Sequence, residues 1–169
     1  MLKFQSAFYC MIVLLLVCLG FCEAFANCPD GWVPYQESCY WIRHDKPLTF
    51  DAAKQHCDHE SGGMGKMLYV SSADENAWIK DYLRDMRVGT TYWWLGLTDK
   101  HTEGSWHWVA SQQQTTFTDF KPGDLGDHNQ EDCAIYASVH NFQWADVACS
   151  INAYPICKIN YNDLELFGK

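Results

Sequence analysis

The 169-residue chain lacks several patterns that would mark an enzyme, a zinc protein or a nucleic-acid-binding protein. It has no Cys-x-x-Cys pair, so its nine cysteines do not indicate a zinc site. It has no Gly-x-Ser-x-Gly motif or other nucleophile–base arrangement, and we therefore expect no catalytic residue. Only 12 lysines and arginines oppose 21 acids, which argues against nucleic acid as a partner.

The chain has only one strongly apolar run, at its start, and no internal repeat or low-complexity tract. Lys3 precedes an uncharged stretch whose most apolar part is 10–22, and Ala24 and Ala26 occupy the small-residue positions of a cleavage site. This pattern indicates a secretory signal peptide over residues 1–26, because a membrane anchor needs about 20 apolar residues. We predict a secreted, extracellular protein with no membrane insertion after cleavage.

The mature chain is predicted to be one domain over residues 27–169, with a core at 28–158 and a short C-terminal tail. Cleavage would remove three cysteines and leave six, an even number that in a secreted chain indicates three disulfides. Six cysteines allow fifteen pairings, so their spacing does not fix the connectivity. The six are Cys28, Cys39, Cys57, Cys133, Cys149 and Cys157.

Hydrophobic periodicity predicts an α+β fold in which two helices are followed by strands. Helical spacing begins at Phe50 and ends near Gly62, and the capping box Ser72–Glu75 opens a second helix. Later aromatic and β-branched segments predict strands, of which 92–97 is the most apolar. The span 98–130 is mostly loop, and long loops of this kind usually carry function.

The stretch Phe120–Cys133 is polar and rich in glycine and acids. From Asp99 to Asp132 the chain has seven acids but only two bases, Lys100 and Lys121. Carboxylates crowded in this way repel one another, and calcium prefers several oxygen ligands from a flexible loop. A calcium-binding loop and a solvated surface loop are both consistent with these residues.

The order of six short motifs resembles the C-type lectin-like domain family, and within it the secreted perlucin-like lectins of invertebrates. The motifs are Cys28-x-x-Gly-Trp32, Cys39-Tyr40, Trp94-Leu-Gly-Leu97, Glu131-Asp-Cys133, Trp144-Ala-Asp146 and Pro155-Ile-Cys157. The resemblance implies two helices flanking small antiparallel sheets, with a long loop region. It also implies the disulfide pairings Cys28–Cys39, Cys57–Cys157 and Cys133–Cys149.

In this family a calcium ion holds protein oxygens and sugar hydroxyls in one coordination shell. Its ligands come from a Glu-Pro-Asn or Gln-Pro-Asp tripeptide, a downstream glutamate and a Trp-Asn-Asp strand. The corresponding sugar-binding residues here are Asp124, Leu125, Gly126, His128, Glu131 and Asp146. Gly126 and Ala145 offer no side-chain oxygen, and Leu125 replaces a proline that is typically cis. The chain therefore departs from the family's sugar-binding pattern.

The resemblance also implies an auxiliary calcium position, and here the chain keeps a carboxylate at every matching residue. The predicted metal ligands are Asp99, Glu103, Asp127, Glu131 and Asp132. Because calcium prefers oxygen ligands, we predict that it binds at this position more readily than at the altered sugar site. The alternative is that these acids are simply exposed, with Asp132 held by a hydrogen bond.

The resemblance implies a secreted carbohydrate-binding lectin, calcium-dependent or calcium-stabilised, that recognises microbial or self glycans and glycoconjugates in innate immunity. The alternative is a structural module that binds no sugar, such as a shell-matrix component that meets a protein or mineral surface. The missing ligand side chains and the lost proline favour this alternative. Retention on an immobilised glycan with release by a chelator would favour the lectin.

Overall fold

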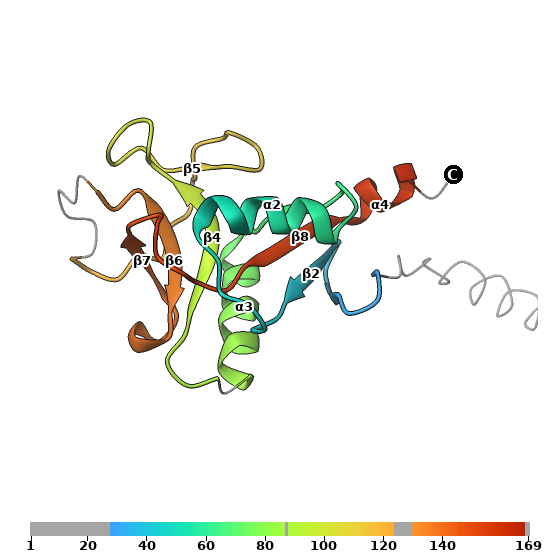
Figure 1. The fold of residues 1–169 in the computed structure, drawn as a ribbon, viewed down its shortest axis with the longest axis horizontal. Helices are drawn as coiled ribbons and strands as arrows, with labels where there is room; N and C mark the ends of the chain where they lie inside the picture. Colours follow the sequence, from blue (N-terminus) through green and yellow to red (C-terminus); the bar gives the residue numbers. More distant parts are fainter. Residues whose placement is uncertain (1–27, 87, 124–129, 168–169) are drawn as a thin grey trace, which may run out of the picture.

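Two four-stranded antiparallel sheets form the framework of the protein (Figure 1). The computed structural model describes residues 28–86, 88–123 and 130–167. The first sheet has the order β1 (Val33–Tyr35), β2 (Ser38–Ile42), β8 (Ile156–Asn160) and β3 (Lys66–Met67). The second has the order β5 (His107–Trp108), β4 (Tyr92–Thr98), β6 (Cys133–Ala137) and β7 (Gln143–Val147). The predicted α+β class and the small antiparallel sheets are confirmed.

In the described residues three helices accompany the sheets, α2 (Phe50–Glu60), α3 (Ala73–Asp85) and α4 (Tyr161–Phe167), with a 3-10 turn η1 (Ser138–His140). The helix α2 lies against β3, β4 and β8 (Figure 1). Its buried residues Phe50, Ala53 and Cys57 share one face because they recur at helical spacing. The Phe50 ring meets Trp94 of β4 edge-on, with ring centroids 5.3 Å apart.

The third helix, α4, is a correction to the predicted pattern of two helices followed by strands and a short tail. Seven residues are too few to form a stable helix alone, so local pattern gave little signal. Tertiary contacts stabilise it instead, since Tyr161 and Leu164 pack against the core. The Tyr161 N–H also donates to the Glu37 carbonyl, 3.0 Å away, at the β1–β2 turn.

The strand β4 lies inside the second sheet, between β5 and β6. Its side chains Trp93, Trp94, Leu95 and Leu97 are almost fully buried. Gly96 allows the two sheets to approach, because its N–H donates to the Leu68 carbonyl at 2.8 Å. A Cβ at this position would lie only 2.7 Å from that oxygen, closer than any ordinary contact. The glycine of the Trp-Leu-Gly-Leu motif is thus required by packing.

Three disulfides reinforce this framework, as predicted, and their pairing is the one that the resemblance implies. Cys28–Cys39 closes the β1–β2 hairpin region, and Cys57–Cys157 joins α2 to β8 across 100 residues of sequence. Cys133–Cys149 joins β6 to the segment that follows β7. In the loop-entropy treatment, a bond that closes 100 residues contributes about 4.7 kcal/mol, the largest share of the three.

The predicted capping box at α3 forms only in part. Ser72 Oγ accepts from the Glu75 N–H at 3.1 Å, as predicted, but the Glu75 carboxylate turns into the protein. There it accepts from the Ser71 N–H at 2.8 Å, from Tyr40 Oη at 2.8 Å and from Lys158 Nζ at 2.6 Å. Burial lowers the pKa of Lys158, and the Glu75 charge opposes that shift. Glu75 therefore ties α3 to the first sheet.

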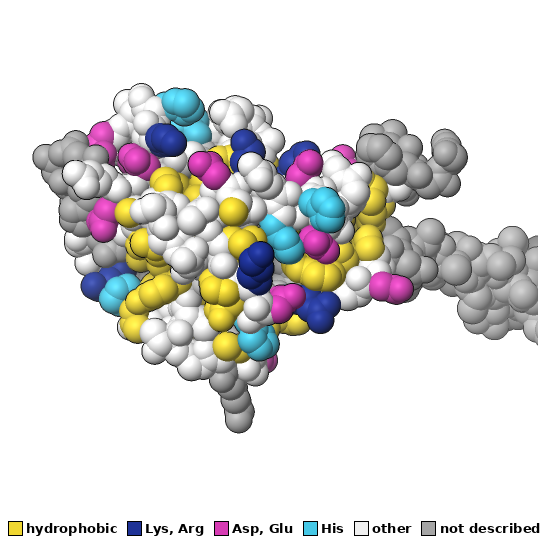
Figure 2. Space-filling model, viewed as in Figure 1, with side chains coloured by type: hydrophobic (Ala, Val, Ile, Leu, Met, Phe, Trp, Pro, Cys, Tyr) yellow, Lys and Arg dark blue, Asp and Glu magenta, His cyan; other side chains and the backbone are white. Residues whose placement is uncertain are grey.

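The outer surface mixes acidic, basic and apolar side chains on the face that carries α2 (Figure 2). Within residues 28–86, 88–123 and 130–164, Tyr92 and Val139 are the exposed large hydrophobic side chains. No helix in the described part of the chain is long and apolar enough to cross a membrane. The predicted signal peptide, residues 1–26, lies outside the described residues.

Replacement of Lys158 by Met should lower the free energy of unfolding by about 3–5 kcal/mol, because it leaves the Glu75 carboxylate buried without a cation. The matched control is Lys66→Met, which breaks an exposed pair with Asp58 and should cost about 0–1 kcal/mol. Urea unfolding of the two variants measures the difference. Equal losses in both variants would contradict this account of the buried pair.

Candidate functional site

Two of the predicted ligand residues meet where β4 ends and β6 begins. Asp99 directly follows β4 and Asp132 directly precedes β6, and the strands pair there through Thr98 and Cys133. The Asp132 carbonyl accepts from Thr98 Oγ1 at 2.6 Å and from the Asp99 N–H at 3.3 Å. Strand pairing thus brings together two carboxylates that are far apart in the sequence.

The Asp99 carboxylate is the most unusual group at this position, since the residue is only 2% exposed. Its Oδ2 accepts from the Gly104 N–H at 2.8 Å, while its Oδ1 has no hydrogen-bond partner among the described residues. Burial raises the pKa of Asp99, and the nearby Asp132 charge raises it further, against the opposing hydrogen bond from Gly104. A buried oxygen without a partner costs about 1–3 kcal/mol, which a cation would offset.

Asp99 also shapes the turn that leads from β4 to β5. The Thr102 N–H donates to the Asp99 carbonyl at 2.8 Å, and the Ser105 N–H donates to the Thr102 carbonyl at 2.9 Å. Gly104 adopts a φ of 75°, which favours glycine, so that its N–H reaches the Asp99 carboxylate. The same turn carries the predicted ligand Glu103 on its exposed side.

The fit to a calcium ion is partial in the described part of the chain. No group of three or more His, Cys, Asp and Glu side chains lies close enough together there to hold a metal ion. Of the predicted ligands, Asp99, Glu103, Glu131 and Asp132 are described, and Asp127 lies outside the described residues. The structure brings Asp99 beside Asp132, with a buried carboxylate oxygen available, but it does not assemble a cage from the four described acids.

Four of the predicted sugar-binding residues, Asp124, Leu125, Gly126 and His128, lie outside the described residues. Of the other two, Glu131 is half-buried just before β6, and Asp146 is 6% exposed on β7, opposite Ala134 of β6.

The stretch Phe120–Cys133 is anchored by β-structure at both ends. Phe120 forms a bridge with Trp144 of β7, and Cys133 begins β6.

A buried polar residue that sequence reasoning missed supports this anchor from α3. Asn76 Oδ1 accepts from Tyr136 Oη at 2.8 Å and from Trp144 Nε1 at 3.0 Å. Its Nδ2 donates to Asp119 at 2.8 Å, and Asp119 is paired with Lys80. Trp144 is fully buried, so it lies in the core and not on a surface where a sugar could stack.

Comparison with known proteins adds a family and several relatives. The family profile described as "Lectin C-type domain" matches residues 46–159. A "Perlucin-like protein" of Mytilus galloprovincialis is 31% identical and covers 82% of this chain and 86% of its own. An "Alpha-N-acetylgalactosamine-specific lectin" of Patiria pectinifera is 31% identical and covers 79% of this chain and 83% of its own.

Solved structures share the fold as well. The mouse scavenger receptor C-type lectin carbohydrate-recognition domain is 28% identical, with a TM-score of 0.66, and the match covers 79% of this chain and 98% of that one. Some curated relatives are much longer, and the chain spans only 40% of one human protein and 32% of another.

Replacement of Asp99 by Asn should stabilise the calcium-free protein at pH 7, because it removes a buried carboxylate charge. The pKa of Asp99 is raised, so the parent ionises this group at a cost as pH rises through that pKa. The difference in melting temperature should be small at or below the ordinary pKa of 3.8 and should reach a few degrees at pH 7. Thermal unfolding in a chelator from pH 3.5 to 7 measures it; a gap that shrinks with rising pH would contradict this reasoning.

Proposed function

Because the chain belongs to the C-type lectin domain family, we propose that it is a secreted lectin that binds glycans and is stabilised by calcium. This family consists of non-enzymatic carbohydrate-binding proteins, and membership in it confirms the prediction that the chain is not an enzyme. The three disulfides support an extracellular location, since such bonds persist in oxidising surroundings.

The observation that carries the role of calcium is the buried Asp99 carboxylate beside Asp132. Calcium bound there would neutralise charge that burial makes costly. The chain's own residues already hold the two acids in place, through the hydrogen bonds of Thr98 and Gly104. We infer that Glu103, Asp127 and Glu131 complete the ligand set.

The glycan-binding part of the proposal is supported by relatives and by the position of the loop. The Patiria pectinifera lectin is named for N-acetylgalactosamine, which makes this sugar the first one to test. Asp146 on β7 and Glu131 before β6 border the loop whose ends the second sheet fixes. These two residues, together with Asp124, Leu125, Gly126 and His128, form our proposed glycan-binding surface.

A second candidate is a module of the same fold that binds a protein or mineral surface instead of a glycan. Ala145, only 7% exposed on β7, favours it, because a buried methyl group stands where the family pattern has an asparagine ligand. The net charge of −9 suits a cationic mineral face. The two candidates differ in whether a sugar competes for binding.

Calcium titration by calorimetry should detect binding to the parent and a loss of at least tenfold in affinity in Asp99→Ala, because that change removes the buried carboxylate. Asp146→Ala should retain calcium binding if the auxiliary position is the site occupied. The matched control is Asp45→Ala, an exposed acid remote from this turn in sequence. Unchanged affinity in Asp99→Ala would rule out the auxiliary position.

Retention on immobilised N-acetylgalactosamine or on a broad glycan array should occur in millimolar calcium, and a chelator should release the protein. The Asp99→Ala variant should elute earlier than the parent, because calcium no longer fixes the base of the Phe120–Cys133 loop. A protein that binds calcium but no glycan would favour the second candidate, and binding to mineral crystals that excess sugar leaves unchanged would establish it.

A further inference from the structure

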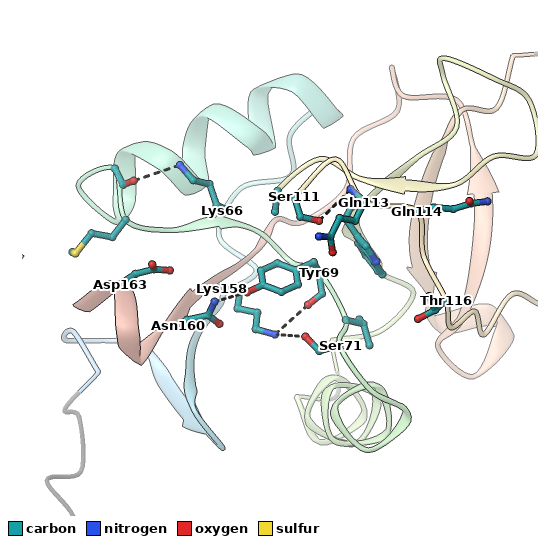
Figure 3. A pocket seen from close by; sticks show the side chains of 15 residues that line it. Lys66, Tyr69, Ser71, Ser111, Gln113, Gln114, Thr116, Lys158, Asn160 and Asp163 are labelled. Atoms are coloured by element: carbon teal, nitrogen blue, oxygen red, sulfur yellow. Dashed lines mark hydrogen bonds between the residues drawn. The ribbon is translucent and has the colours of Figure 1, made fainter. Parts of the chain in front are cut away.

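A polar groove of about 620 Å³ lies outside the candidate site described above. Its walls come from three parts of the chain, 63–71 after α2, 108–116 around and after β5, and 158–163 at the end of β8 and the start of α4. Figure 3 shows Asn160 and Asp163 on one side, Ser111, Gln113, Gln114 and Thr116 on the other, and Tyr69 and Lys158 between them. The volume is in the range of small-molecule sites in proteins.

The floor of the groove is held by partly buried hydrogen bonds. Lys158 Nζ donates to the Tyr69 carbonyl and to Ser71 Oγ, both at 3.3 Å, and lies 4.2 Å from the centre of the Tyr69 ring. Asn160 donates to Tyr69 Oη and accepts from Ser38 Oγ at 3.0 Å. A ligand would therefore meet a floor whose side chains are already fixed, which reduces the entropy that binding costs.

The facing wall offers amide groups on an ordered backbone. The Trp108 N–H donates to the Gln113 carbonyl at 2.9 Å, and Gln114 forms a β-bridge with His107. The side chains of Gln113 and Gln114 are exposed and make no hydrogen bond to another described residue. Each amide can both donate and accept, as sugar hydroxyls do.

The charges around the groove nearly cancel. Lys158 is paired with Glu75 at 2.6 Å, and Lys66 is paired with Asp58 at 3.2 Å, which leaves Asp163 as the remaining charged lining residue. A strongly charged ligand would gain little here. A protein partner is also disfavoured, because protein interfaces depend on large apolar or arginine anchors, and the exposed large hydrophobics of the described surface, Tyr92 and Val139, do not line this groove.

We propose that this groove binds a neutral oligosaccharide without calcium, as a second glycan site separate from the Phe120–Cys133 loop. Amide and hydroxyl groups on the 108–116 wall bind the sugar hydroxyls, and the Tyr69–Lys158 floor supports the sugar from below. The family profile ends at residue 159, so the wall supplied by Asn160 and Asp163 lies beyond the matched region. The groove is therefore partly built by residues outside that match, and it does not depend on the calcium-linked site proposed above.

The test is an NMR titration of the disulfide-bonded protein in excess chelator, with maltotetraose, cellotetraose, chitotetraose and mannotetraose as separate probes. Binding of at least one probe should shift the amide signals of Tyr69 and of residues 108–116. Gln113→Ala/Gln114→Ala should weaken that binding at least tenfold, and so should Thr116→Arg, whose long side chain would fill the groove. The matched control Gln55→Ala removes an exposed glutamine of α2 that does not line the groove, and its affinity should equal that of the parent.

The two proposals fail in different ways. Asp99→Ala should leave binding in chelator unchanged, whereas it should weaken any calcium-linked retention. No shifts with any of the four probes would overturn the groove proposal, as would equal affinity in the parent and in both groove variants. Shifts confined to the residues that border the Phe120–Cys133 loop and lost in chelator would also overturn it, while supporting the first site.

Discussion

The close approach of Gly96 to Leu68 holds the two sheets of the protein together. The hydrogen bond between them, 2.8 Å long, brings the segment after β3 against β4 and so joins the two sheets. From that contact Asp99 is three residues further along one chain segment, and Tyr69 is the next residue along the other. The candidate calcium site and the polar groove therefore both lie a few residues from this contact, where a side chain at residue 96 would meet the Leu68 carbonyl.

The two sites differ in whether their charged side chains are paired. At the end of β4, burial of Asp99 beside Asp132 leaves negative charge without a protein cation among the described residues, which is the condition under which a metal ion is favoured. In the groove, each lysine has its own acid, and the 2.6 Å pair of Lys158 with Glu75 is sealed from water. This difference in charge is the basis for proposing calcium at the first site and a neutral ligand in the groove.

Much of the framework follows from local pattern and from motif order. The apolar run of β4 and the helical spacing of α2 needed no tertiary information, because both periods are visible over a few residues. Asn76 and Glu75 show where such reasoning ends. Asn76 lies on the buried face of α3 with Ile79 and Leu83, but an asparagine gives no hydrophobic signal, and its partners on β6 and β7 could be known only from the fold.

The groove was beyond sequence reasoning for a different reason. Its walls come from three distant segments, and one of them depends on α4, a helix stabilised by contacts with the core rather than by its own composition. Exposed glutamines have no periodicity that distinguishes a binding wall from ordinary surface. Asp99 and Asp132 differ from the groove residues, since the family resemblance already predicted both as calcium ligands. The structure brings the two residues together through strand pairing, and their binding of calcium stays a prediction.

The position of α4 has a consequence for how the protein could be displayed. Its start is fixed to the β1–β2 turn by the bond between Tyr161 and Glu37, so the first strands and the last helix lie together at one end of the domain (Figure 1). The ends of the Phe120–Cys133 loop lie at the opposite end (Figure 1). Tethering the domain through either end of the described chain would leave the ends of that loop facing away from the support. An array of domains tethered in this way would present many such loops side by side and gain avidity for a repetitive surface.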